Sequence, residues 1–301
     1  PEILKDIENN SCKINKTEFD VIEKFDKLNT LKNNNSKISS FITIQEGCDK
    51  FCNFCVVPYT RGPEYSRSME EILLEAKTLV DQGTKEIILL GQNVNAYRNK
   101  NNKLSDLINK LQSIDKLKRI RYTTSHPKDM TDDLIDAHQN CSKLMPLLHL
   151  PVQSGSSKIL KLMNRKHNVE EYIDIIKKLK TKKPNIKFSS DFIIGYPGET
   201  QEDFNHTIDL MENIQFINSY SFVYSSRPGT PASNLSPNTL EISKKRLSIF
   251  QDISDKIKKK DRKKFLNKEV NVLFENKLKD QNKFFGRDEY ANSVLVESNK
   301  D

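Results

Sequence analysis

The sequence lacks two features that would assign it to a membrane protein or to a disulfide-rich class. No apolar run reaches 18 residues, which excludes a recognisable transmembrane helix. Cysteine is scarce, with five residues in 301, and three of the five lie close together, which does not suit a disulfide framework. The first residue is Pro1 rather than Met, so we expect a piece of a longer chain, whose upstream part leaves room for a targeting segment.

The clustered cysteines are Cys48, Cys52 and Cys55, and no fourth cysteine follows nearby. Together they predict a reducing compartment and one metal site. The isolated Cys12 and Cys141 are interpreted as plain thiols. Lys and Arg number 49 against 41 Asp and Glu, a net charge of +8, which favours an anionic partner such as RNA. Lys and Asn are abundant throughout the chain, however, as a biased genome composition would also produce.

Short β-rich runs alternate with amphipathic segments from Ile38 onward, whereas residues 1–37 look peripheral, with a short helix and an Asn-rich linker. The predicted strands are "SFITIQEG", "KEIILLGQN", "RIRYTTSHP", "MPLLHLPVQSG", "KFSSDFIIGYPG" and "SYSFVYSSRPGT". The predicted helices are "SMEEILLEAKTLVDQG", "KLSDLINKLQSID", "TDDLIDAHQNC", "SSKILKLMNRKHNVEEYIDIIKKLKTKKP" and "TQEDFNHTIDLMENIQF". Ser68 and Thr200 are expected to cap the first and last of these helices.

Six strand–helix repeats predict a parallel α/β fold, either a barrel or an open doubly wound sheet. Polar, turn-forming residues follow the strands, as in "TTSHP", "PVQSG" and "GYPGET", and such strand ends favour the barrel. After Thr239 a long basic amphipathic helix is predicted. An alternating β pattern then runs to Asp301 and predicts a small β module.

Three hypotheses compete for the clustered cysteines. A zinc site would need a fourth ligand, for which His126, His149 or His167 would have to come from another strand end. A redox Cys-x-x-Cys pair would leave Cys48 unexplained. An iron–sulfur cluster held by three thiolates would keep one iron open for a ligand that is not protein.

The spacing Cys48-x3-Cys52-x2-Cys55, with Phe54 before the last cysteine, resembles the radical S-adenosylmethionine superfamily. The resemblance implies a partial (β/α)6 TIM-like barrel and a [4Fe-4S] cluster whose open iron binds S-adenosylmethionine. An electron from the cluster then cleaves the sulfonium to give a 5′-deoxyadenosyl radical. By the same resemblance Phe54 packs near the adenine, although it would also serve as an ordinary loop anchor.

Further stretches, spanning Ile38 to about Phe265, resemble the methylthiotransferases, most closely the tRNA branch (the MiaB family): "VVPYTRG", "LLGQNVNAY", "LHLPVQSGS", "LMNRKH" and "SSRPGTPA". The resemblance implies a transferase that adds a methylthio group to C2 of N6-isopentenyladenosine next to the tRNA anticodon. The alternatives are a methylthiotransferase acting on another tRNA adenosine or on a ribosomal protein, and a non-catalytic, zinc-stabilised RNA-binding protein.

The resemblance also implies site residues. Cys48, Cys52 and Cys55 would hold the cluster. Cofactor contacts would come from Phe54, Gly91, Gln92, Gln153, Ser154, Arg165, Gly195, Gly198 and Glu199. Glu199 stands four residues after Gly195 where the family pattern expects three, Gly91 would also suit a plain turn, and Arg165 would also suit a helix cap. RNA contacts, or else plain solvated surface, are expected at Tyr59, Arg61, Arg67 and Arg227. No side chain is assigned as a catalytic acid or base.

The implied organisation is the tail of an N-terminal methylthiotransferase domain (1–37), a radical S-adenosylmethionine core (38–264) and a partial RNA-binding TRAM module (265–301). A second [4Fe-4S] cluster is expected only in the full-length protein, so this chain should cleave S-adenosylmethionine without completing methylthiolation. The expected partners are the tRNA anticodon stem-loop and an electron donor such as flavodoxin or ferredoxin, in a cytoplasmic monomer. Phe284, Phe285 and Tyr290 would stack RNA bases or form the core of the module.

Overall fold

The computed structural model describes residues 37–279 and 282–297. The predicted N-terminal helix, Cys12 and the Asn-rich linker up to residue 36 therefore lie outside the described residues. Six strands form the framework, and all of them match predicted strands: β1 (Ser39–Thr43), β4 (Glu86–Leu90), β7 (Arg119–Tyr122), β8 (Leu147–His149), β9 (Lys187–Ile194) and β10 (Asn218–Val223).

The six strands run parallel in chain order. β1, β4 and β7 form one sheet, and β8, β9 and β10 form a second. An isolated parallel bridge between Ile120 and Leu144 joins β7 to the segment that leads into β8. Within the described residues, β1 and β10 each pair on one side only, so the sheet curves without closing. The prediction of a partial six-stranded barrel is confirmed.

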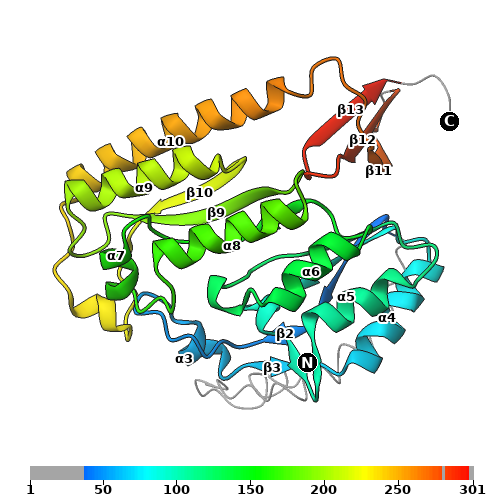
Figure 1. Cartoon of the computed structure of the whole chain (residues 1–301), viewed down its shortest axis with the longest axis horizontal. Helices are drawn as coiled ribbons and strands as arrows, with labels where there is room; N and C mark the ends of the chain where they lie inside the picture. The colour runs from blue at the N-terminus through cyan, green and yellow to red at the C-terminus, as the bar shows by residue number, and fades with distance from the viewer. Residues whose placement is uncertain (1–36, 280–281, 298–301) are drawn as a thin grey trace, which may run out of the picture. The chain divides into compact units, whose positions relative to one another are not determined.

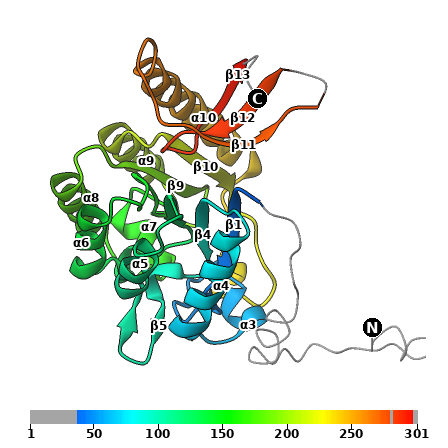
Figure 2. The same cartoon turned by 90° about the vertical axis from the view of Figure 1, so that its right-hand side faces the viewer.

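The helices lie around the outside of the strands, as Figures 1 and 2 show. They are α3 (Val57–Arg61), α4 (Met69–Asp81), α5 (Leu104–Gln112), α6 (Asp132–Asn140), α7 (Ser157–Leu162), α8 (Val169–Lys182), α9 (Gln201–Ile214) and α10 (Leu240–Lys263). Ser68 accepts a hydrogen bond from the Glu71 N–H, and Thr200 forms a reciprocal capping box with Asp203. Both predicted caps are confirmed. None of the described helices combines the length and apolar character needed to cross a bilayer.

One predicted helix is wrong. The sequence pattern predicts a single helix over 156–184, but the structure has two, α7 and α8. Asn164 adopts a left-handed backbone with φ of 54°, which stops α7. Asn168 then starts α8 with a capping box that it shares with Glu171. The two asparagines therefore insert a loop between helices whose apolar periodicity alone looks continuous.

The apolar core lies between the strands and the helices rather than in the barrel lumen. Ile42, Leu89 and Phe192 point outward from their strands and are fully buried against the helices. Inward-facing positions such as Phe41 and Ile88 alternate with them and keep part of their surface accessible. Short elements complete the fold: β2 (Gln45–Glu46), β3 (Tyr65–Ser66), β5 (Arg98–Asn99), β6 (Asn102–Lys103) and the 3-10 helices Val94–Ala96, Pro127–Asp129 and Pro231–Asn234.

The predicted β module is a three-stranded antiparallel sheet of β11 (Leu273–Lys277), β12 (Lys283–Arg287) and β13 (Ser293–Glu297). It lies at the N-terminal ends of the barrel strands. Arg119, the first residue of β7, donates from Nη1 to the carbonyls of Arg287 (2.8 Å) and Asp288 (3.1 Å). Lys187, the first residue of β9, forms an ion pair with Asp261.

Aromatic side chains of this region pack within the protein. The Lys187 ammonium lies 4.3 Å from the Phe265 ring centroid and 4.4 Å from that of Tyr290, and the Tyr290 hydroxyl donates to the Asn185 carbonyl. The Phe284 ring packs edge-on against Phe274. The structure thus favours the packing alternative for these aromatics over base stacking.

Candidate functional site

The three clustered cysteines lie on the loop that follows β1 and β2, at the C-terminal end of the barrel. All three are free thiols; Cys52 is buried, and Cys48 and Cys55 are half-buried. The N–H of Cys48 donates to the Gly62 carbonyl at 3.2 Å, and that of Cys55 donates to the Cys52 carbonyl at 2.9 Å. The loop is therefore ordered by its own backbone before any ligand is considered.

Gly47 anchors the start of this loop. Its φ is +75°, and a Cβ added there would lie 1.9 Å from the Pro63 carbonyl oxygen, so only glycine fits. The Gly47 N–H donates to Oε1 of Gln92 at 2.8 Å. Gln45, which is fully buried, donates from Nε2 to the Gly47 carbonyl at 2.7 Å. The sequence reasoning missed Gly47 and Gln45, although a glycine directly before the first cysteine was a visible signal.

The far side of the loop is fastened to two distant segments. The Asn53 N–H donates to the Met163 carbonyl just after α7, at 2.9 Å, and its Nδ2 donates to the Leu162 carbonyl at 2.8 Å. The Ala232 N–H, from the segment that precedes α10, donates to the Asn53 carbonyl. Phe54 packs against the small apolar cluster of Ile159, Met163, Tyr196 and Ala232. This packing agrees with its alternative role as a loop anchor.

The thiols are close enough to influence one another electrostatically. Burial raises the pKa of Cys48 to about 11, and the charges of Glu64, Cys52 and Cys55 act in the same direction. Burial likewise raises the pKa of Cys55, with a further contribution from Cys52 and an opposing one from Arg165. Two neighbouring thiols with a raised pKa, those of Cys48 and Cys55, suit a cationic metal centre, which deprotonates the thiols that bind it.

The described side chains contain no preformed site for a single metal ion. In the described part of the chain, no three His, Cys, Asp or Glu side chains converge as one metal ion requires. Zinc–sulfur bonds of about 2.3 Å would hold all the sulfurs of such a site close together. In an iron–sulfur cluster each thiolate can instead bind a different iron, which permits wider spacing.

Two of the three histidines considered as a fourth zinc ligand pack against each other, and the third lies in the lumen. The rings of His126 and His167 pack edge to face, with centroids 5.5 Å apart. Burial lowers the pKa of both, so they stay neutral. His149 lies in the lumen, where its Nδ1 pairs with the Ser189 hydroxyl at 3.0 Å. Neutral imidazole is the form that binds zinc, so metal analysis rather than these pKa shifts separates zinc from an iron–sulfur cluster.

Arg165 reaches the thiol loop from the segment after α7. Its Nη1 lies 3.5 Å from the Cys52 sulfur, and its Nη2 donates to the Pro151 carbonyl at 2.7 Å. Its Nε is buried and has no hydrogen-bond partner among the described residues. A buried guanidinium donor without a partner is costly, so this nitrogen is suited to an anionic ligand.

Gly91 and Gln92 support the same loop. A Cβ on Gly91 would lie 2.7 Å from both the carbonyl and the Oε1 of Gln45, which explains the glycine at this position through packing. The Gln92 carboxamide is occupied by Gly47, as described above. Gln153 has φ of 77° and pairs through its backbone with Asp191. The Ser154 hydroxyl accepts the Ser156 N–H and lies 3.4 Å from the Thr207 hydroxyl, so it faces α9.

Glu199 is committed to a structural ion pair. It is buried, and its Oε2 accepts bonds from Nη1 of Arg246 on α10 (2.8 Å) and from the Gly195 N–H (3.0 Å). Burial raises the pKa of Glu199 against the lowering effect of these two donors.

Gly195 has φ of +73°, and a Cβ there would meet Ser243 at 2.2 Å, whereas Gly198, with φ of +84°, faces only Leu162. Arg246 was missed by the sequence reasoning because it is one of many basic residues on that helix.

The four residues expected to meet RNA divide into two groups. Tyr59 and Arg227 are exposed. Arg61 is half-exposed, and its Nη1 forms an ion pair with Oε1 of Glu46 at 3.2 Å. Arg67, by contrast, is 2% exposed and forms an ion pair with Glu75 at 2.7 Å. The prediction that Arg67 contacts RNA is wrong, because packing under α4 removes its charge from the surface.

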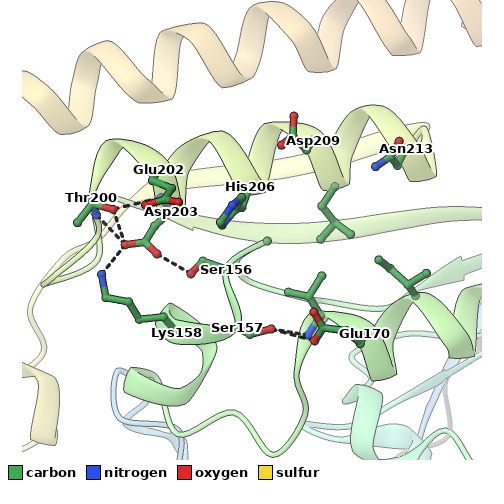
Figure 3. A pocket seen from close by; sticks show the side chains of 14 residues that line it. Ser156, Ser157, Lys158, Glu170, Thr200, Glu202, Asp203, His206, Asp209 and Asn213 are labelled. Carbon is green, nitrogen blue, oxygen red and sulfur yellow. Dashed lines mark hydrogen bonds and ion pairs between the residues drawn. The ribbon is translucent and has the colours of Figure 1, made fainter.

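The cavity drawn in Figure 3 lies between α7, α8 and α9, has a volume of about 550 Å³, and contains no cysteine. The Asp203 carboxylate orders it by accepting hydrogen bonds from the Ser156 hydroxyl (2.7 Å), the Lys158 ammonium (2.8 Å) and the Thr200 N–H (2.9 Å). Burial opposes ionisation of Asp203, but the bonds from Lys158, Thr200 and Ser156 outweigh it and lower its pKa. The network therefore fastens α9 to α7.

Asp203→Asn is expected to lower the free energy of unfolding by about 2 kcal/mol at pH 7, because it removes a buried charged acceptor from donors on Ser156, Lys158 and Thr200. A carboxyl whose pKa is lowered by folding stabilises the protein above its ordinary pKa of 3.8, and that stability is lost as the pH falls. Urea unfolding at pH 7 and at pH 3 measures the difference. Asp209→Asn, on the exposed face of the same helix, is the matched control and should be neutral. Equal effects of the two variants would contradict the role of Asp203.

Comparisons with known proteins agree with this geometry. Residues 42–211 match the family described as the radical SAM superfamily. The chain resembles proteins named tRNA-2-methylthio-N(6)-dimethylallyladenosine synthase from Pelagibacter ubique (60% identity, 96% of this chain and 66% of the relative) and Neorickettsia sennetsu (50%, 98% and 64%). A third, from a Wolbachia of Brugia malayi, is 48% identical over all of this chain and 70% of the relative. The chain thus spans about two thirds of the length of these curated relatives.

Among solved structures, the chain resembles the radical S-adenosylmethionine methyltransferase TsrM from Kitasatospora setae, solved with cobalamin and a [4Fe-4S] cluster. The TM-score is 0.54 at 15% identity, covering 64% of this chain and 38% of that one. At this identity the likeness shows the fold alone. The family match and the sequence relatives show that the chain belongs to the radical SAM superfamily and, within it, to the family of the tRNA-2-methylthio-N(6)-dimethylallyladenosine synthases.

Proposed function

We propose that this chain forms the radical-generating part of a tRNA methylthiotransferase, which adds a methylthio group to C2 of an N6-isopentenylated adenosine next to the anticodon. The observation that carries the proposal is the arrangement of three free, mutually interacting thiols on the loop after β2, with the guanidinium of Arg165 beside them. The name that the relatives share supports the choice of substrate.

Cys48, Cys52 and Cys55 are proposed to hold a [4Fe-4S] cluster. When bound, the cluster supplies the electron that cleaves S-adenosylmethionine, and this is the source of the radical chemistry. The fit rests on three free thiols that share one loop and on the raised pKa values of Cys48 and Cys55, which a cationic centre would reverse. Gly47, Gln92 and Asn53 orient the thiols through backbone hydrogen bonds.

Arg165 is proposed to bind the carboxylate of S-adenosylmethionine, because its buried Nε has no partner within the described residues. Phe54 and the backbone near Gly91, Gln153, Gly195 and Gly198 would line the rest of that cofactor site. Ser154 and Glu199 would act indirectly, since their side chains are already engaged with α9 and α10. Tyr59, Arg61 and Arg227 remain proposed RNA contacts at the same end of the barrel.

The proposed division of the chain is a radical S-adenosylmethionine core over 38–264 and a TRAM-like module over 265–301. Within the described residues the one cysteine outside the loop is Cys141, which is buried in the core. A second cluster would therefore need ligands from elsewhere in the full-length protein. The proposed partners are tRNA and a flavodoxin or ferredoxin. Because the proposed substrate is tRNA, we place the reaction in the cytoplasm, with a monomeric enzyme.

The function is tested by nucleoside analysis of tRNA from a strain that lacks the gene. We expect N6-isopentenyladenosine to accumulate in place of its 2-methylthio derivative, and the full-length gene to restore the derivative. An unchanged tRNA profile, with a methylthio group missing from a ribosomal protein, would contradict the tRNA assignment. Anaerobic metal analysis tests the cofactor separately. About four irons per cluster with visible absorbance support it, and one zinc without colour contradicts it.

A further inference from the structure

A network of charged and polar side chains holds the residues that follow Cys48. The Asp49 N–H donates to Oε1 of Glu64 at 3.3 Å, and the Glu64 N–H donates back to Oδ1 of Asp49 at 3.2 Å. The Lys50 ammonium forms an ion pair with Oδ1 of Asp129 at 2.8 Å. The Lys50 N–H also donates a hydrogen bond to the Cys48 sulfur, which acts to lower its pKa. The part of the loop next to Cys48 is therefore tied to two carboxylates, Glu64 and Asp129.

Asn93 joins these two carboxylates to each other. Its Nδ2 donates to Oδ2 of Asp129 at 2.7 Å and to Oε1 of Glu64 at 3.1 Å, so both hydrogens of the amide are used. Its backbone N–H donates to Oε1 of Gln45 at 2.8 Å. Asn93 is 2% exposed, so the bridge is buried. A buried bridge of this kind holds Glu64 and Asp129 in fixed positions.

The network brings more negative than positive charge to the Cys48 side of the loop. Glu64 and Asp129 are carboxylates, and Lys50 is the ammonium between them and the thiols. The side chains of Lys50 and Asp129 are 18% and 19% exposed, so solvent ions screen them less than they screen surface charges. The charge of Glu64 acts on Cys48 and raises its pKa, so this carboxylate lies within electrostatic range of the sulfur.

We propose that Glu64, Asp129 and Lys50 set the reduction potential of the iron–sulfur cluster on the three thiols, and that Asn93 is the positioning residue that holds the two carboxylates. Negative charge near such a cluster disfavours an added electron, so Glu64 and Asp129 lower its potential, whereas Lys50 raises it. The inference rests on the proposed function, which places the cluster on this loop.

A lowered potential suits the proposed chemistry. The electron that cleaves S-adenosylmethionine must reduce a sulfonium, and a lower potential of the electron's source gives that step more driving force. Net charge and hydrogen bonds to the sulfurs are two of the features that set the potential of an iron–sulfur cluster. Both are present here, because Lys50 bonds the Cys48 sulfur through its backbone and Glu64 acts on that sulfur through its charge.

The test uses charge variants of similar shape in the full-length protein, reconstituted anaerobically and titrated by electron paramagnetic resonance. Glu64→Gln should raise the ratio of reduced to oxidised cluster about tenfold at a fixed donor potential, an upward shift of about 59 mV for one electron. Asp129→Asn should shift the potential upward as well, and Lys50→Met should shift it downward. Iron content should stay unchanged in all three variants.

Two controls accompany these variants. Glu212→Gln removes the same charge from the exposed face of the outer helix α9 and should keep the wild-type potential. The signal of the loop cluster is identified by its absence from Cys52→Ala. Hydrogen exchange of metal-free protein measures the positioning role separately. Asn93→Ala should speed exchange of the amides of residues 47–50 about tenfold, whereas Glu212→Gln should not.

An unchanged potential in Glu64→Gln, or shifts of the same sign in Glu64→Gln and Lys50→Met, would overturn the inference. Loss of iron from these two variants would show that the network serves only to fold the loop, which also overturns it. All of these results arise in variants of a wild-type protein that holds its cluster. Wild-type protein that binds no iron would instead overturn the proposed function and this inference together.

Discussion

Cys52→Ala is expected to leave the protein without its iron–sulfur cluster and to reduce S-adenosylmethionine cleavage to background. Cys52 is the buried member of the three thiols, and its sulfur lies 3.5 Å from Nη1 of Arg165, which is proposed to bind the cofactor. Losing one of three ligands should cost more than the roughly 10–100-fold that loss of an outer partner costs. Iron and sulfide content, visible absorbance and 5′-deoxyadenosine yield after anaerobic reconstitution measure the effect.

Cys141→Ala is the matched control for this prediction. Cys141 is also a buried free thiol, but it packs in the main core, where burial raises its pKa. The variant should keep its iron and its cleavage activity and lose only some stability from the smaller side chain. Retained cleavage in Cys52→Ala, or equal iron loss in both variants, would overturn the assignment of the cluster to the loop.

Gly47→Ala is expected to abolish cluster binding while leaving the barrel folded. The new methyl group would lie 1.9 Å from the Pro63 carbonyl oxygen and 2.6 Å from that of Gly62, so the backbone that carries Cys48 must move. The Gly47 N–H bond to Gln92 would be lost with it. Iron content should fall to background, because three thiolates must be positioned together to hold one cluster.

Gly62→Ala separates the steric effect from backbone strain. Gly62 lies on the same loop with φ of +77°, but an added Cβ there has no atom within 4 Å. Alanine at this position should cost about 1–3 kcal/mol of backbone strain and keep the cluster. Thermal unfolding and iron analysis of both variants provide the comparison. If Gly62→Ala loses its iron as fully as Gly47→Ala, the close contact with Pro63 is not the cause.

Most of the secondary structure could be predicted from the sequence, because it depends on the local pattern of residues. Six strands and most helices follow from apolar periodicity, and the caps at Ser68 and Thr200 follow from residue type at fixed spacing. The prediction over 156–184 is wrong because the break depends on two asparagines, Asn164 and Asn168, within a pattern that still looks helical. A single residue with a left-handed backbone does not change the apolar periodicity of the sequence around it.

Which charged side chains of the site are buried and paired was the hardest property to predict from the sequence. Arg67 and Arg61 look alike in the sequence, yet one is buried against Glu75 and the other is half-exposed. Glu199 looks like part of a ligand motif, but Arg246, 47 residues away, neutralises it. An ion pair between helices depends on which faces meet, and no local spacing encodes that.

By itself the sequence determined the repeat of strands and helices and the three thiols on one loop, because periodicity and covalent spacing are local. Only the tertiary structure decided which side chains face the lumen, which charges are paired and where the β module lies. Arg119 and Arg287 are 168 residues apart, and their contact exists because the barrel brings the start of β7 to β12. The same folding leaves β1 and β10 unpaired on one side within the described residues and exposes Phe41, Tyr220 and Phe222 between them. Burial and pairing at such sites depend on partners distant in the chain, so they appear only once the chain is folded.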